Sequence, residues 1–184
     1  RGLVGSEMCI RDSTNRFAED HTARTAWSHT QPPLLVHTLH PGDVALATRG
    51  ETLETLLGSC VSVILTDPRR TVGAMCHIVH TPRPGHSSHD SPAHGHAALK
   101  AMDRLLIGQG IQPHLCEAYV FGGGNMFPQV VRDRHVGETN AGWVLEALAS
   151  RGTRVLQVDQ GGTCYRRVRW MVGPGEPQVH SVTV

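Results

Sequence analysis

Residues Cys60-Val-Ser-Val-Ile-Leu-Thr66, then Asp67-Pro68, then Val72–Val79, carry the pattern that decides the fold. The first stretch is rich in β-branched side chains and runs into Asp-Pro, which favours a turn. The second stretch reads as a strand that returns from that turn, so the sequence predicts a β-hairpin. A hairpin of this length brings His77 back beside the start of the first strand, near Cys60.

Short strands and two helices are expected on either side of this hairpin. Turn residues separate apolar runs upstream of it, and apolar residues recur at helical spacing twice downstream. The expected strands are Leu34–Leu39, Val44–Thr48, Cys116–Phe121, Arg154–Val158, Tyr165–Val172 and Val179–Val184, and the expected helices are Ala97–Gln109 and Ala141–Arg151. This mixture predicts a strand-rich α+β domain.

The apolar residues within these elements predict which faces are buried. For the first helix the expected buried stripe is Ala98, Ala101, Met102 and Leu105. For the second helix it is Ala141, Val144, Leu145 and Leu148, with Asn140 or Thr139 as the N-cap. In the strand Tyr165–Val172, apolar residues alternate with Arg167 and Arg169, a pattern typical of a half-exposed strand.

Length and charge restrict the possible classes of function. The chain has 184 residues, with 17 Lys and Arg against 16 Asp and Glu, which fits one domain and argues against nucleic-acid binding. Apolar runs stay well short of the roughly 20 residues of a membrane span, so no membrane insertion is expected. Residues 1–33 are expected to be an adaptor-derived start and a disordered, flexible leader, and residues 34–184 a single domain.

The cysteines indicate the redox environment. Their number is five, which is odd, and no secretory signal precedes them. Reduced thiols are therefore expected rather than a disulfide framework, and the predicted location is the cytoplasm.

The segment Thr55-Leu-Leu-Gly58-Ser59-Cys60 places a thiol at the mouth of the first hairpin strand. Successive backbone amides at such a bend can bind an anion and favour a thiolate. A free cysteine can equally be a small buried apolar residue. The proximity of His77 favours the chemical interpretation, because a Cys–His pair is the minimum for an activated thiol nucleophile.

Five segments, in this order along the chain, resemble the chemoreceptor glutamine deamidases of the CheD family. They are Thr55-Leu-Leu-Gly-Ser-Cys-Val61, Gly73-Ala-Met-Cys-His77, Phe121-Gly-Gly-Gly-Asn-Met-Phe127, Val136-Gly-Glu-Thr-Asn140 and Asp159-Gln-Gly-Gly162 with the Arg-containing strand after it. The resemblance implies two packed mixed β-sheets flanked by helices, a layered α/β/β/α sandwich similar to the catalytic domains of deamidating bacterial toxins. It also implies a protein-glutamine glutaminase, an amidohydrolase that releases ammonia from glutamine side chains of methyl-accepting chemotaxis receptors.

The resemblance further implies roles for individual residues. Cys60 is expected to be the nucleophile, His77 its general base and acid, and Thr55 the residue that orients the imidazole. The register of the threonine is open, since Glu54 lies one step upstream and Thr52 is a weaker candidate. Ser59, Gly123 and Asn125 are the expected substrate-binding residues. No cofactor and no metal is expected, and the protein should associate with membrane receptor arrays from the cytoplasm.

Two other functions compete with deamidation. The chain might act as a non-catalytic binding partner of a receptor-adaptation phosphatase, as some relatives do. A metal-dependent hydrolase is the other alternative, because imidazole is a common ligand of transition metals. Its candidate ligands are His77, His80, His86, His89, His94 and His96. Their spacing fits no closed metal site.

Overall fold

The computed structural model describes residues 35–81, 91–130 and 135–184. Within them the chain forms nine strands, two α-helices and one turn of 3-10 helix, Pro113–Leu115. The predicted leader, residues 1–33, lies outside the described residues. The strands are β1 Val36–Leu39, β2 Val44–Thr48, β3 Thr52–Leu57, β4 Val61–Thr66, β5 Val72–Ile78, β6 Glu117–Gly122, β7 Arg154–Gln160, β8 Cys164–Met171 and β9 Gln178–Thr183, and the helices are α1 Gly95–Gly108 and α2 Val136–Ser150.

The strands form two sheets that pack face to face. One sheet has the order β1-β3-β8-β9 and the other the order β2-β5-β4-β6-β7. Each is mixed, because the pairs β1–β3 and β6–β7 are parallel and the remaining pairs are antiparallel. The predicted α+β fold with two mixed sheets is therefore confirmed.

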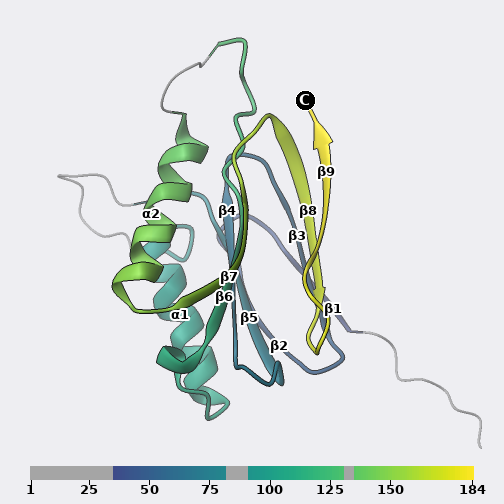
Figure 1. Ribbon diagram of the computed structural model, residues 1–184, viewed down its shortest axis with the longest axis vertical. Helices are drawn as coiled ribbons and strands as arrows, with labels where there is room; N and C mark the ends of the chain where they lie inside the picture. Colours follow the sequence, from purple (N-terminus) through teal and green to yellow (C-terminus); the bar gives the residue numbers. More distant parts are fainter. Residues whose placement is uncertain (1–34, 82–90, 131–134) are drawn as a thin grey trace, which may run out of the picture. The chain divides into compact units, whose positions relative to one another are not determined.

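The layer of helices differs from the expected α/β/β/α order. Both α1 and α2 lie on the same side, over the outer face of the five-stranded sheet (Figure 1). In the described part of the chain no helix covers the four-stranded sheet, whose outer face exposes Leu56, Tyr165 and Met171. The alternation along β8 accounts for this face: its inward residues are buried, whereas Arg167 and Arg169 point outward.

Two apolar clusters hold these layers together. One lies between the helices and the five-stranded sheet, and the other lies between the two sheets. The central strands β4 and β5 contribute to both clusters and are buried along their whole length. The ends of these two strands are therefore held rigidly, which matters because Cys60 immediately precedes β4 and His77 lies in β5.

Three details of the helices and strands depart from the predictions. The helix α2 begins at Val136 rather than Ala141, and its cap is His135, whose Nδ1 accepts a hydrogen bond from the Glu138 N–H at 3.2 Å. In α1 the buried residues include Leu99 and Leu106 in place of Ala101 and Leu105. The strand β3 was not predicted as a separate element.

Candidate active site

The predicted hairpin forms and fixes the relation between Cys60 and His77. Its strands pair Val61 with Ile78 and Ser62 with His77. Side chains alternate along a strand, so Cys60 shares a face with Ser62, and His77 lies opposite Ser62 on that same face. This face points into the gap between the two sheets, where Cys60 packs against the inter-sheet cluster.

Thr55 meets His77 across that gap. The Thr55 hydroxyl oxygen lies 2.9 Å from His77 Nδ1 and also donates to the Leu39 carbonyl at 2.9 Å. A hydroxyl has one proton, and here that proton goes to Leu39, so the Thr55 oxygen accepts the proton of His77 Nδ1. The resulting relay, from imidazole to hydroxyl to carbonyl, fixes the tautomer and leaves Nε2 with its lone pair.

The environment of His77 keeps the imidazole neutral. Burial lowers the pKa of His77, and the Leu39 carbonyl and the Asp43 carboxylate offset this effect only in part. Nε2 is buried, and no described residue hydrogen-bonds it. A neutral imidazole with an unoccupied Nε2 is the state that a general base requires.

Cys60 is a thiol at rest. Burial raises the pKa of Cys60, which opposes the thiolate that the nearby backbone amides were predicted to favour. Desolvation therefore outweighs any effect of those amides. The thiol needs a base to remove its proton, and His77 is the imidazole that shares its face of the sheet.

The glycine turn after β6 supports the backbone on both sides of Cys60. The Gly123 N–H donates to the Cys60 carbonyl at 2.8 Å, and the Gly124 N–H donates to the Gly58 carbonyl at 2.9 Å. Gly122 has φ +110°, and a Cβ there would lie 2.2 Å from the Cys60 carbonyl oxygen. Only glycine fits this close approach, because any side chain would push the Cys60 peptide away.

The three predicted substrate-binding residues lie around this turn with different surroundings. Gly123 uses its N–H to hold Cys60, so that donor is not free for a substrate. The Asn125 side-chain oxygen accepts from the Phe127 N–H at 3.0 Å, and the Asn125 N–H donates to the Gly162 carbonyl. Ser59 is half-buried beside Cys60.

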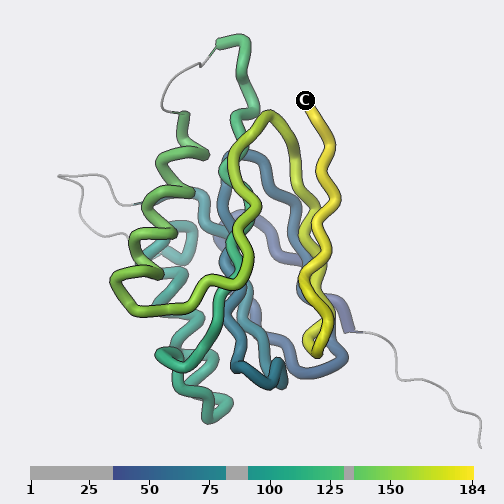
Figure 2. The backbone as a smooth tube through the Cα atoms, in the orientation of Figure 1, coloured from purple at the N-terminus to yellow at the C-terminus, as the bar shows by residue number. Residues whose placement is uncertain are grey.

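Sequence reasoning did not select two residues that build the same end of the molecule. Arg166 is buried and donates to Asp159 at 2.9 Å and to the Gly161 carbonyl at 2.8 Å. These bonds fix the loop by which the chain crosses from β7 in one sheet to β8 in the other (Figure 2). The Asp159-Gln-Gly-Gly162 motif was the available signal, although its spacing alone did not say which residues pair.

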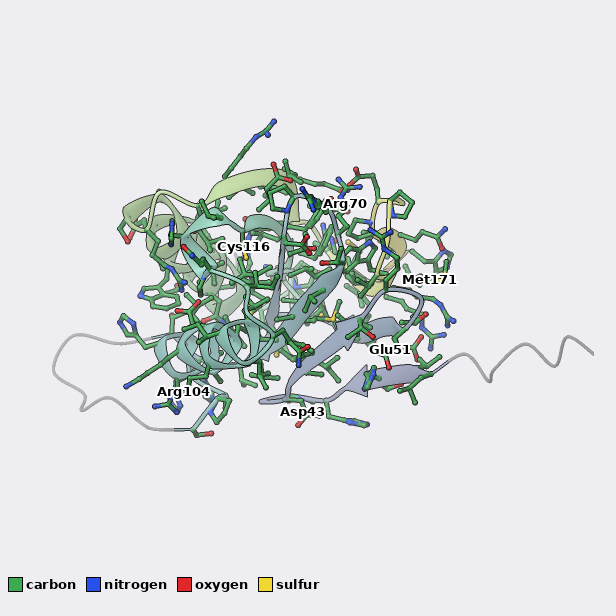
Figure 3. The ribbon with its side chains drawn as sticks, turned by 90° about the horizontal axis from the view of Figure 1, so that it is seen from below. Asp43, Glu51, Arg70, Arg104, Cys116 and Met171 are labelled. Atoms are coloured by element: carbon green, nitrogen blue, oxygen red, sulfur yellow. The ribbon has the colours of Figure 1, made fainter. Side chains whose placement is uncertain are left out.

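The turns at the other end of the sheets lie far from Cys60. Figure 3 labels Glu51, Arg70 and Met171, which come from the β2–β3 turn, the β4–β5 turn and the end of β8. Cys60 lies at the opposite end of β4 from Arg70, next to the start of β8. The candidate site is thus confined to the end of the sandwich where β3 and β6 stop.

The remaining cysteines and histidines do not form a second centre within the described residues. All described cysteines are free, and no three His, Cys, Asp or Glu side chains there converge as metal ligands. His86 and His89, two members of the predicted histidine cluster, lie outside the described residues. Cys76 is wholly buried, which raises its pKa to about 12.

Together, the sandwich and its Thr–His pair behind a loop cysteine define a candidate thiol-dependent hydrolase. The family described as "CheD chemotactic sensory transduction" matches residues 80–181 of the chain. The chain therefore belongs to the CheD family, as its motifs predicted. The match begins after His77, so the roles of Cys60 and His77 rest on geometry and on the motif resemblance.

Several relatives carry the name "Probable chemoreceptor glutamine deamidase CheD". One from Pseudomonas savastanoi pv. phaseolicola is 34% identical over 136 residues, covering 71% of this chain and 75% of its own length. One from Albidiferax ferrireducens, with the suffix 2, is 35% identical over 149 residues, covering 78% and 86%. Among solved structures, a hypothetical protein YfiH from Bacillus licheniformis matches at TM-score 0.39 and 13% identity over 67% of this chain and 58% of its own, too remote to support an argument.

The helices of the described residues are also relevant to the expected lack of membrane insertion. Neither α1 nor α2 combines the length and the apolar composition needed to cross a bilayer.

Proposed function

We propose that this protein is a chemoreceptor glutamine deamidase in which Cys60 is the nucleophile, His77 the general base and acid, and Thr55 the residue that orients His77. The observation that carries the proposal is the buried Thr55–His77 hydrogen bond, with Nε2 unoccupied among the described residues. The names of the relatives support the substrate class. The near-balanced charge of the chain fits a protein side chain better than a phosphate backbone as the target.

The reaction follows from this arrangement. His77 Nε2 takes the Cys60 proton, and the sulfur attacks the carboxamide carbon of a glutamine side chain. The tetrahedral intermediate collapses as the imidazolium protonates the leaving nitrogen, which departs as ammonia and leaves a thioester. Water, deprotonated by the same imidazole, attacks the thioester and releases glutamate and the Cys60 thiol. The net change consumes one water and one carboxamide and yields one carboxylic acid and one ammonia.

Backbone amides beside Cys60 are the proposed oxyanion donors. Among the described residues, neither the Ser59 N–H nor the Cys60 N–H donates a hydrogen bond to another group. Removing one such donor costs about 3–4 kcal/mol of transition-state stabilisation in well-characterised enzymes. The Gly123 N–H is already used, so Gly123 contributes by shaping the turn.

The rim of the site suits a folded protein substrate. Phe127 and Val130, which follow the glycine turn, are 69% and 82% exposed, and Asn125 lies beside them. Exposed apolar side chains next to a reactive group are typical of a protein-binding surface. On this basis the substrate is a receptor helix presented in the cytoplasm at receptor arrays, with Ser59 and Asn125 near the glutamine. Binding of an adaptation phosphatase would use the same exposed rim.

Mass spectrometry of a receptor cytoplasmic fragment tests the proposal. Wild-type protein should release ammonia and give the mass increase that marks conversion of a carboxamide to a carboxylate. Cys60→Ala should do neither while keeping the wild-type melting temperature. Cys116→Ala is the matched control, because it removes a buried thiol beneath the helices and should leave turnover unchanged. Deamidation by Cys60→Ala would contradict the mechanism.

A further inference from the structure

A buried asparagine on α2 contacts the backbone on both arms of the catalytic hairpin. Asn140 is 2% exposed. Its Nδ2 donates to the Val79 carbonyl at 2.9 Å and to the Ser59 carbonyl at 3.4 Å. Its Oδ1 accepts from the Thr81 hydroxyl at 3.2 Å, and this bond fixes which end of the carboxamide faces the two carbonyls.

These two carbonyls lie where the hairpin ladder ends. The last register pair is Val61 with Ile78, so continuing the register places Val79 opposite Cys60. Beyond the ladder, strand pairing no longer supplies donors to the buried carbonyls of the two arms. Asn140 supplies both missing donors from a single side chain, at the position of the nucleophile.

The bond to Ser59 also sets the direction of a neighbouring donor. The Ser59 carbonyl and the Cys60 N–H belong to one trans peptide, whose carbonyl and N–H point in opposite directions. Since Asn140 draws the carbonyl toward α2, the Cys60 N–H must point away from α2. The Cys60 side chain packs toward the inter-sheet cluster, which also lies on the side away from α2.

The next peptide is held from the same helix. The Cys60 carbonyl accepts the Gly123 N–H, and Gly123 lies against Gly137 of α2, where a Cβ would come within 2.5 Å of it. Gly137 and Asn140 are three residues apart and so lie on one face of α2. One face of α2 therefore constrains the peptides on both sides of the Cys60 α-carbon.

We infer that Asn140 is a positioning residue for the deamidation reaction: it orients the Ser59–Cys60 peptide so that the Cys60 N–H serves as an oxyanion donor. This inference rests on the proposed function. It assigns Asn140 no contact with the substrate and no proton transfer. Its effect is confined to steps in which negative charge develops on the carboxamide oxygen.

Two reactions of Cys60 separate this role from general support of the fold. Deamidation passes through an oxyanion, whereas alkylation by iodoacetamide displaces iodide from carbon and forms none. Both reactions need the Cys60 thiolate and His77. A variant that misdirects the Cys60 N–H should therefore slow deamidation and leave alkylation at the wild-type rate.

Asn140→Asp is the primary variant, because it keeps the side-chain shape and replaces the donor with a carboxylate oxygen. We expect kcat on a receptor fragment to fall about 10- to 100-fold, as for a small misplacement of a catalytic group. KM should be unchanged, since the lost interaction exists only in the transition state. The alkylation rate of Cys60 should equal that of wild type.

Two further variants keep the test decisive. Val144→Ala lowers stability from the same helix, but its apolar side chain bonds no carbonyl, so kcat should be unchanged. If Asn140→Asp does not fold, Thr81→Val removes only the hydroxyl that orients the carboxamide, and it should give a smaller selective loss of kcat. Unchanged kcat in the folded Asn140 or Thr81 variant, or an equal fall in deamidation and alkylation, would overturn the inference. An inactive wild type in the same assay would instead refute the proposed function.

Discussion

Replacing Thr55 with valine removes one hydroxyl from the centre of the proposed site. The valine has nearly the same shape, so the packing between the sheets should persist. The His77 Nδ1–H then loses its acceptor in a buried position, at a cost of about 1–3 kcal/mol. The loss falls on the tautomer that leaves Nε2 free, so it raises the barrier for proton transfer. At 1.36 kcal/mol for each tenfold change, kcat should fall roughly 5- to 150-fold.

Ammonia release from a receptor fragment measures this effect, with matched variants as controls. Thr55→Ser restores the hydroxyl and should retain most of the turnover. Thr52→Val alters another buried threonine of the same strand, three residues away, and should retain wild-type turnover. Full activity in Thr55→Val, or an equal loss in Thr52→Val, would refute the assignment of Thr55 as the orienting residue.

Two other outcomes follow from the geometry around Cys60. Gly122→Ala should lower both the melting temperature and turnover, because its Cβ would meet the Cys60 carbonyl at 2.2 Å, whereas Gly108→Ala has open space and should be neutral or stabilising; a folded, fully active Gly122→Ala would contradict this. The lowered pKa of His77 should keep kcat/KM high below pH 6.5, the ordinary imidazole value, with the acid limb at lower pH. The unfolded chain binds that proton first, so His77 stabilises the fold above pH 6.5 and this contribution is lost as the pH falls toward the folded-state pKa; a wild-type acid limb above 6.5 would argue against His77 as the base.

The elements that the sequence predicted well are those whose pattern is local. The hairpin of β4 and β5 needs only β-branched runs and an Asp-Pro turn, and β8 shows its two faces by alternation. The start of α2 was missed because its cap is His135, which is outside the usual set of Ser, Thr, Asp and Asn. Four helical residues before Asn140 were therefore assigned to the preceding loop.

The parts of the site that could not be predicted depend on contacts between distant segments. The strand β3 pairs in parallel with β1 and in antiparallel with β8, which lies more than 100 residues further on. The choice between Thr52 and Thr55 depended on how the two sheets stack, and no local pattern contains that information. The resemblance supplied Cys60 and His77 as partners, whereas Asn140 appeared only as a motif letter until its three hydrogen bonds were seen.

The division of the site between two sheets links turnover to strand register. Cys60 and His77 belong to the five-stranded sheet, whereas Thr55 belongs to the four-stranded one. Side chains alternate along β3, so a slip of one residue would turn Thr55 outward and bring Glu54 or Leu56 toward the imidazole. A molecule misaligned in this way could keep its secondary structure and its thiol and still be inactive. Turnover therefore distinguishes correctly registered molecules from those that have only the correct content of strands.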